Sequence, residues 1–417
     1  MGAAAHLGGD GGDHCQSVAA AAGRPGMTRI EAAWTRREDL RAMLTAIDPA
    51  GDRCRYVGGA VRDALLGIEA TDIDIATRLL PEDVIARLEA AGIRAVPTGL
   101  AHGTVTAVLP GGPVEITTLR RDVTTDGRHA EVAFTDDWRE DAARRDFTIN
   151  ALFADPATLE VTDYFDGLQD LNAALVRFIG DAGERILEDH LRILRYFRFH
   201  ARFGGAVDAE AVAACSEHAE RLKALSRERI ARELLLLLGA ADPLASAQLM
   251  EDCGIWKVVL PEMAEDGLAR LAELLARERA LGAERSALLR LAALLPPDPL
   301  LADTVAARLR LSKAQRLAMA RFATPWPSGG TARRIAADVQ PAELVAPWLL
   351  LRAPEVMVEL GWRSLHGWQV PDFPLGGRDI IALGIPPGPA VAKTLGEVRR
   401  RWIAEDFPED ARLAEIA

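Results

Sequence analysis

The hydrophobic pattern of this 417-residue chain changes at about Glu184. Before that point, segments with strand-like alternation lie between short helical segments. Beyond it, Leu, Ala and Arg recur at helical spacing almost to the end, and Pro-rich breaks divide the helices into groups. Since the chain is also too long for one small domain, we expect a mixed α/β head followed by a long helical arm.

The head contains clear strand and helix signals. Cys54-Arg55-Tyr56-Val57 predicts a strand that leads through Gly58-Gly59 into a helix over residues 60–66. Asp72-Ile73-Asp74-Ile75-Ala76 alternates acidic and aliphatic residues, which predicts a second strand. The same rules predict three further elements: a helix over residues 81–91 and strands over 103–109 and 114–119, the strands joined by a turn at Pro110-Gly111-Gly112-Pro113.

Composition excludes several classes of protein. The net charge of −12 excludes a globally basic nucleic-acid binder, although local arginine patches remain compatible with it. The four cysteines form no CxxC pair, so a zinc site or disulfide framework is not expected and a cytoplasmic location fits. No apolar run approaches the roughly 18 residues needed to span a membrane. Residues 1–28 are rich in Gly and Ala, and we expect them to be disordered rather than a signal peptide.

The first group of residues with chemical meaning is Val57-Gly58-Gly59-Ala60-Val61-Arg62-Asp63, followed by Asp72 and Asp74. Two glycines between a strand and a helix let backbone N–H groups approach phosphate oxygens, and Arg62 can add a charged contact. Residues two apart on a strand face the same way, so Asp72 and Asp74 can hold Mg²⁺ beside that phosphate. Taken separately, the glycines could be a simple turn and the aspartates a solvated edge.

Glu115 is the candidate for a third carboxylate. It lies in the alternating segment Val114-Glu115-Ile116-Thr117, which could pair with the strand that carries Asp74. An exposed polar strand position is the alternative.

A second group is Arg144-Arg145-Asp146-Phe147-Thr148-Ile149-Asn150-Ala151-Leu152. We expect its charged end to face a site, with Asp146 orienting Arg145, while Phe147, Ile149 and Leu152 enter the core. A helix start with a charged cap is the alternative.

A third group lies in Glu188–Phe199, where Asp189, Arg192, Arg195 and Arg198 recur every three residues and would form a polar stripe on one helix. Leu187, Leu191, Leu194 and Phe197 would supply its apolar packing. An Asp acceptor beside an Arg donor could pair with a nucleobase edge, and further arginines could hold a triphosphate. An ordinary solvated face with ion pairs is the alternative.

Together these groups resemble the class II tRNA nucleotidyltransferases, the CCA-adding enzymes, and the related bacterial poly(A) polymerases. The resemblance covers roughly Arg55 to Leu238. It rests on six motifs in order, namely GGAVRD, DID, RRDFTINAL, YFDGLQDL, EDHLRILRYFRF and SRERIARELLLLL.

The resemblance implies an α+β protein, with a polymerase-β-like nucleotidyltransferase head followed by an all-α neck, body and tail. It implies that Asp72 and Asp74 hold catalytic Mg²⁺, with Glu115 as a further candidate. It assigns nucleotide contacts to the glycine turn and to arginines of all three groups, with Asp189 and Arg192 pairing with the base of CTP or ATP. The implied nucleotide-binding residues are Gly58, Gly59, Arg62, Arg145, Asp189, Arg192, Arg195 and Arg198.

The implied reaction is attack of the tRNA 3′-hydroxyl on the α-phosphorus of CTP or ATP, with release of pyrophosphate and no nucleic-acid template. No protein partner is implied.

Thr98–Thr104 departs from the Arg-Arg-Phe pattern of poly(A) polymerases. Residues 121–138 resemble the flexible loop that enzymes adding only CC lack. Full CCA addition is therefore favoured over partial addition (A-only or CC-only) or poly(A) synthesis, and an inactive RNA-binding relative is the alternative from another class.

We expect tRNA contacts in the helical arm, because the segment Ala307–Phe322 carries several basic residues and no acidic one. Arginine stems that cover apolar surface are the alternative. The candidate RNA-binding residues are Arg308, Arg310, Lys313 and Arg316. The expected regions are a disordered extension (1–28), the head (29–180), the neck (181–260) and the body and tail (261–417).

Overall fold

The computed structural model describes residues 28–70, 72–125, 130–339 and 341–416. The expected extension over residues 1–28 lies outside this part, apart from Thr28. The chain divides into two compact units, Met1–Leu222 and Lys223–Ala417. The division falls within the segment expected as the neck, and the four expected regions stay a prediction.

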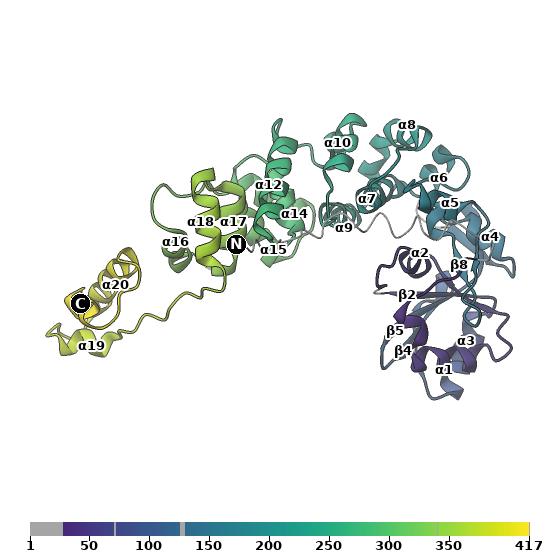
Figure 1. The fold of residues 1–417 in the computed structure, drawn as a ribbon, viewed down its shortest axis with the longest axis horizontal. Helices are drawn as coiled ribbons and strands as arrows, with labels where there is room; N and C mark the ends of the chain where they lie inside the picture. Colours follow the sequence, from purple (N-terminus) through teal and green to yellow (C-terminus); the bar gives the residue numbers. More distant parts are fainter. Residues whose placement is uncertain (1–27, 71, 126–129, 340, 417) are drawn as a thin grey trace, which may run out of the picture. The chain divides into compact units, whose positions relative to one another are not determined.

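The first unit carries all the strands of the described residues (Figure 1). The strands are β1 (Cys54–Val57), β2 (Ile73–Thr77), β3 (Arg94–Gly99), β4 (Thr104–Leu109), β5 (Gly112–Thr118), β6 (Arg120–Thr125), β7 (Ala130–Phe134), β8 (Phe153–Ala154) and β9 (Val161–Thr162). Its helices are α1 (Glu38–Ile47), α2 (Gly59–Leu65), α3 (Pro81–Ala90), α4 (Trp138–Ala143), α5 (Gly167–Asn172), α6 (Ala182–Glu188), α7 (Arg192–Phe203) and α8 (Ala209–Glu217), with 3₁₀ turns η1 (Ala33–Arg36), η2 (Leu100–His102), η3 (Thr148–Asn150) and η4 (Ala219–Ala224), the last of which crosses into the second unit.

Seven of the strands form one mixed sheet in the order β3-β4-β5-β2-β1-β8-β9. β2 and β5 are parallel, whereas the other neighbours are antiparallel. The predicted strands and helices of the head are confirmed to within a few residues, and β3 was not predicted. Residues 121–138, expected to form a flexible loop, contain most of the β6–β7 pair and the start of α4. Residues 126–129 lie outside the described part, and the expected flexibility stays a prediction.

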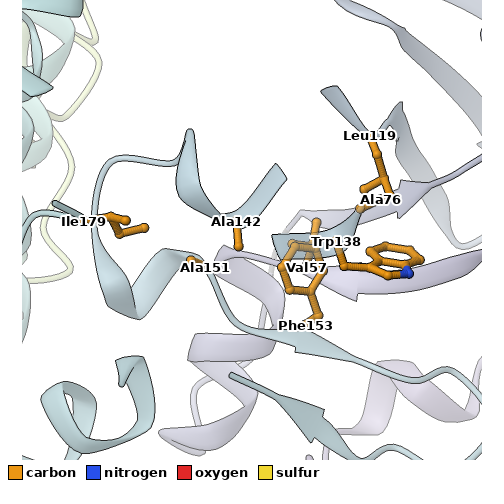
Figure 2. Packing of buried hydrophobic residues seen from close by; sticks show 8 residues of the cluster. All are labelled: Val57, Ala76, Leu119, Trp138, Ala142, Ala151, Phe153 and Ile179. Carbon is orange, nitrogen blue, oxygen red and sulfur yellow. The ribbon is translucent and has the colours of Figure 1, made fainter. Parts of the chain in front are cut away.

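Helices cover both faces of the sheet. α3 packs against β3, β4 and β5, and α1 packs against α3. Near the other end of the sheet, Val57 and Phe153 form a buried cluster with Trp138 and Ala142 of α4 (Figure 2). The Trp138 and Phe153 rings meet edge to face, with their centroids 5.5 Å apart. This cluster fixes α4, and therefore the residues that follow it, over the strands that carry the candidate site.

Aromatic packing docks α7 in the same unit. Phe147 lies 4.8 Å from Phe178 and 5.5 Å from Phe199 of α7, measured between ring centroids. Phe147, Ile149 and Leu152 are all buried, as predicted. Leu187 is 45% exposed, so the prediction that it packs with the other apolar residues of this segment is wrong. It lies on α6, which ends before α7 begins, and so does not share the apolar face of α7.

The described residues of the second unit form helices joined by loops and contain no strand, as the sequence predicted. Its helices are α9 (Arg227–Leu238), α10 (Leu244–Asp252), α11 (Ile255–Val259), α12 (Gly267–Leu281), α13 (Ala287–Leu294), α14 (Pro299–Arg308), α15 (Lys313–Ala323), α16 (Ala332–Asp338), α17 (Val345–Arg352), α18 (Glu355–Leu365), α19 (Gly377–Ala382), α20 (Pro389–Ala404) and α21 (Asp410–Ile416), with the turn η5 (Ala342–Leu344). No helix in the described ranges combines the length and the apolar character needed to cross a membrane.

A buried ion pair joins three of these helices. Arg290 of α13 donates to Glu278 of α12, with an Nη2–Oε2 distance of 2.6 Å, and also to the carbonyl oxygens of Leu238 and Ala240 at the end of α9. Both charged side chains are at most 4% exposed. The pair therefore depends on complete hydrogen bonding within the protein.

We predict that Glu278→Gln lowers the free energy of unfolding by about 3–5 kcal/mol, because it leaves the Arg290 charge buried without its counter-ion. Urea unfolding measures the change. Glu359→Gln, which removes the exposed partner of Arg363, is the control and should cost less than about 1 kcal/mol. Equal costs for the two variants would contradict the prediction.

Candidate active site

The turn between β1 and α2 requires glycine for two reasons. Gly58 has φ +69°, a conformation that other residues adopt only with strain. A Cβ added there would also lie 3.3 Å from Nη1 of Arg145, so this arginine approaches the backbone of the turn closely. The Gly58 N–H is held by the carbonyl oxygen of Leu152 at 3.0 Å.

Two candidate carboxylates lie side by side next to this turn. The parallel register of β2 and β5 pairs Asp74 with Glu115. Extending the antiparallel register of β1 and β2 by one residue beyond the Tyr56–Ile75 pair places Val57, just before the turn, opposite Asp74. Asp74 is half-buried and Glu115 is exposed. The alternation that suggested Glu115 therefore did identify a neighbour of Asp74, although its role stays a prediction.

The surroundings of Asp74 disfavour its charge. Burial and the nearby Glu115 raise the pKa of Asp74 to about 6, with a smaller contribution from Asp72, while Arg145 acts in the opposite direction. Asp72 is exposed and directly precedes β2. Negative charge is thus concentrated where a cation would relieve the repulsion.

These carboxylates fit a hard divalent cation by their chemistry, since such ions prefer oxygen ligands. In the described part of the chain, however, no three carboxylate, imidazole or thiol groups converge into a complete cation site. Further ligands would come from water and substrate phosphates, as is usual for Mg²⁺.

Arg145 is held by an aspartate that the sequence analysis did not single out. Asp141 of α4 accepts from Nε and Nη2 of Arg145 at 3.3 and 3.0 Å, and from Nε of Arg144 at 2.7 Å. Burial alone would raise the pKa of Asp141, but the two arginines outweigh it and lower that pKa. The i,i+4 spacing from Asp141 to Arg145 was the available signal.

The prediction that Asp146 orients Arg145 is wrong. Asp146 instead accepts from Arg195 of α7, with an Nε–Oδ2 distance of 2.7 Å and a second bond from Nη2. The alternative, an α-helix start with a charged cap, is not found at this segment either, because α4 ends at Ala143 and Thr148–Asn150 forms a 3₁₀ turn. The chain turns there, so Asp146 and Arg145 face different partners.

Arg62 lies almost completely inside the protein, at 4% exposure. It donates to Oδ1 of the adjacent Asp63 at 2.9 Å and to Oδ1 of Asn150. Its guanidinium carbon lies 5.1 Å from the ring centroids of both Phe199 and Phe203. The sequence pointed to a phosphate contact by Arg62, and that contact stays a prediction; the structure places this guanidinium in a packed polar network.

Three arginines surround the ring of Phe199. Arg62, Arg195 and Arg198 place their guanidinium carbons 5.1, 5.5 and 4.1 Å from its centroid. Burial lowers the pKa of Arg62, the charge of Asp63 opposes this, and the charges of Arg202 and Arg198 lower it further. An anion bound here would relieve that repulsion between like charges.

The expected continuous helix through Asp189 is also wrong. α6 ends at Glu188 and α7 begins at Arg192, and Asp189 lies between them in extended conformation. Its Oδ1 accepts the Leu191 N–H at 3.1 Å, because a short acidic side chain competes well for backbone donors ahead of a helix. Arg192 donates to Glu188 and, at 2.8 Å, to the carbonyl oxygen of Arg185.

The basic segment of the second unit is partly neutralised by acids from neighbouring segments. Arg308 pairs with Glu262 at 2.6 Å, and Arg316 pairs with Asp303 through two bonds of 2.7 and 2.9 Å. These acids lie outside the segment, so its own sequence could not reveal them. Arg310 and Lys313 are exposed, and the predicted RNA contacts of all four residues stay a prediction.

Comparison with known proteins now identifies the relationship. Residues 54–177 match the poly A polymerase head domain, and residues 206–266 match the probable RNA and SrmB-binding site of polymerase A. The mitochondrial CCA tRNA nucleotidyltransferase 1 of Mus musculus is 35% identical over 388 residues, which cover 88% of this chain and 86% of the relative.

The chain belongs to the family of CCA-adding tRNA nucleotidyltransferases. A CCA-adding enzyme of Levilactobacillus brevis is 32% identical over 89% of this chain and 95% of its own length. The Bacillus stearothermophilus CCA-adding enzyme, solved in complex with CTP, superposes with a TM-score of 0.71 at 27% identity, covering 91% of this chain and 96% of that one. The α+β fold expected for a CCA-adding nucleotidyltransferase is confirmed.

We predict that Asp74→Asn stabilises the metal-free protein in a pH-dependent way. Because the pKa of Asp74 is about 6 in the folded state and near 3.8 when unfolded, ionising it costs stability as the pH rises between these values. The advantage of the variant should be small near pH 4 and reach about 3 kcal/mol above pH 7.

Urea unfolding in EDTA at both pH values measures this advantage. Asp52→Asn, at an exposed position, is the surface control and should change stability by less than about 0.5 kcal/mol at either pH. An advantage for Asp74→Asn that is independent of pH would contradict the prediction.

Proposed function

We propose that this chain adds CCA to the 3′ end of tRNA, transferring CMP and AMP from CTP and ATP with release of pyrophosphate. The observation that carries the proposal is the pairing of Asp74 on β2 with Glu115 on β5, next to the end of β1 that leads into the Gly58–Gly59 turn. Family membership across most of the chain supports the same reaction.

The proposed metal is Mg²⁺, held by Asp72 and Asp74 with Glu115 as a further candidate. When bound, it would supply activation of the 3′-hydroxyl and neutralisation of the leaving pyrophosphate. The chain itself contributes binding and orientation. Gly58 and Gly59 allow close backbone approach.

The arginines are proposed to orient the triphosphate against those carboxylates. Arg145 lies over the glycine turn, and Arg62, Arg195 and Arg198 gather around Phe199. Reaction then depends on positioning and on charge stabilisation rather than on covalent catalysis.

Asp189 and Arg192 are proposed to recognise the base. They lie three residues apart at the break between α6 and α7, where a carboxylate acceptor and a guanidinium donor could meet a nucleobase edge. A break in the helix suits this role because residues there are not committed to a regular helical face.

We further propose that the enzyme works in the cytoplasm. Cys54, Cys215 and Cys253 form no disulfide among the described residues, which suits a reducing compartment.

The regions of the chain are proposed to have different roles. Residues 29–180 would carry out catalysis, residues 181–260 would recognise the base and residues 261–417 would bind tRNA, with residues 1–28 as an extension.

Nucleotide incorporation tests the function directly. A tRNA transcript ending at its discriminator base is supplied with Mg²⁺ and CTP, ATP or both, and products are resolved to single nucleotides. Two additions with CTP and three with both nucleotides are expected. A stop at two with both would indicate a CC-adding enzyme, and a long ladder with ATP alone would indicate poly(A) synthesis. No addition to this transcript, together with a single A on a transcript already ending in CC, would indicate an A-adding enzyme.

We predict that Asp72→Ala and Asp74→Ala lower turnover by at least about 10³-fold while leaving tRNA affinity within about threefold, because the carboxylates serve the reaction and not RNA binding. Single-turnover incorporation and filter binding measure the two quantities. Glu31→Ala, at an exposed position of the same unit, is the control. A protein that binds tRNA but incorporates nothing even as wild type would belong to the binding class.

Arg310 gives a sharper test of the RNA-binding proposal. It follows α14 with φ +58° and closes the helix through bonds from its own N–H to Ala307 and from Leu311 N–H to Ala306, a position that glycine usually occupies. Its side chain is 71% exposed, and its Nε lies 4.0 Å from Oε1 of Glu228, which is itself exposed. Arginine at an exposed position with positive φ is less favourable than glycine, so its presence there suggests that its charge is used in binding RNA.

We predict that Arg310→Gly raises the free energy of unfolding by about 1 kcal/mol, because the backbone strain is relieved. The same variant should weaken tRNA binding several-fold. It should also reduce the slope of log binding constant against log salt concentration by about the amount expected for one phosphate contact. Thermal unfolding and binding at several salt concentrations measure these opposite effects. Asp406→Gly, at another residue with positive φ, is the control and should stabilise without weakening tRNA binding. Unchanged binding by Arg310→Gly would remove Arg310 from the interface.

A further inference from the structure

Asn150 links two arginines that come from different helices. Its Oδ1 accepts from Nη1 of Arg62 on α2, and its Nδ2 donates to Oδ1 of Asp146 at 3.0 Å. The other oxygen of Asp146, Oδ2, accepts hydrogen bonds from Nε and Nη2 of Arg195 on α7. A continuous chain of hydrogen bonds thus runs from α2 through the η3 turn to α7.

The interior location of this chain makes its geometry specific. Asn150 is 7% exposed and Asp146 is 8% exposed, so water cannot readily replace a lost partner. The carboxamide can face only one way, because turning it over would point its oxygen at the Asp146 carboxylate and its NH₂ at the Arg62 guanidinium. Asp146 is also fixed by the Phe147 N–H at 2.9 Å.

Electrostatics shows why such a link is needed. Burial raises and Arg195 lowers the pKa of Asp146, which ends at about 2, so the carboxylate is ionised and paired at neutral pH. Arg62 and Arg195 approach the same ring, that of Phe199, and carry like charges. Asn150 and Asp146 give the two guanidinium groups separate hydrogen-bond acceptors, which fix the direction of each group at that ring.

We propose that Asn150 is a positioning residue for nucleotide binding, which sets Arg62 through its oxygen and Arg195 through Asp146. This inference rests on the proposed function. It assigns Asn150 no contact with substrate. Its effect is to hold two arginines of separate helices in a fixed mutual orientation toward one triphosphate.

The test exchanges the two polar groups. Asn150→Asp places a second carboxylate against Asp146, and Asp146→Asn removes the charge that fixes Arg195. Each single variant should raise the KM for both CTP and ATP by about tenfold or more, with the KM for tRNA within about twofold of wild type, because only arginine orientation changes.

The double variant Asp146→Asn with Asn150→Asp keeps one carboxylate and one carboxamide in reversed order. It should recover nucleotide KM to within about threefold of wild type, since both arginines again have acceptors. Recovery is expected to be incomplete because the Phe147 N–H loses its carboxylate acceptor.

Thr148→Val is the matched control. It lies on the same 3₁₀ turn, is 2% exposed and donates to Asp170, outside the chain of bonds through Asn150. It should lower the thermal midpoint without raising the nucleotide KM. If it raises that KM as much as Asn150→Asp does, Asn150 has only a general structural role.

Two outcomes distinguish failure of the positioning role from failure of the proposed function. If the wild type incorporates CMP and AMP but the single variants keep its nucleotide KM, or the double variant is no better than the worse single one, the positioning role is overturned. If the wild type incorporates neither nucleotide, the proposed function itself fails. Thermal unfolding of each variant shows that the compared proteins are folded.

Discussion

The parallel pairing of β2 with β5 determines where the candidate chemistry can occur. These strands are not consecutive, since α3, β3 and β4 lie between them, and α3 packs back onto β3, β4 and β5 to complete the crossover. The resulting register places Asp74 opposite Glu115. A slip of one residue would turn one of these carboxylates to the opposite face and pair the other with an aliphatic side chain.

That pairing carries an electrostatic cost, visible in the raised pKa of Asp74. Proteins keep such unfavourable charge mainly where function uses it. The surrounding structure is correspondingly rigid: Trp138 and Phe153 pack α4 onto the sheet, and Asp141 holds Arg145 over the glycine turn. The carboxylates of β2 and β5 and the guanidinium of Arg145 are therefore held close together by the packing of α4 and by the Asp141–Arg145 ion pair.

The arginines are organised by a second principle. Each of three arginines has its own aspartate partner. Asp63 pairs with the adjacent Arg62, Asp141 pairs with Arg145 four residues later, and Asp146 pairs with Arg195 of α7. A guanidinium has several donors in one plane, so one edge can be fixed by the protein while the group still directs charge toward an anion. Asn150 joins two of these pairs, which makes the orientation of one arginine depend on that of the other.

The sequence by itself determined the class of fold, the main strands and helices of the head, and the position of the candidate carboxylates, because local hydrophobic period, glycine turns and strand alternation are properties of neighbouring residues. It did not determine β3, the break at Asp189 or the β6–β7 pair, because strand pairing and the competition of a side chain for backbone donors depend on a backbone conformation that the sequence pattern alone does not fix. Above all it could not show that Asp146 serves Arg195, 49 residues away, rather than the adjacent Arg145. Nor could it show that Glu262 and Asp303 neutralise arginines expected to be available for RNA. Only the tertiary structure decided these pairs, since an ion pair depends on distance in space and the folded chain, not the sequence spacing, sets that distance.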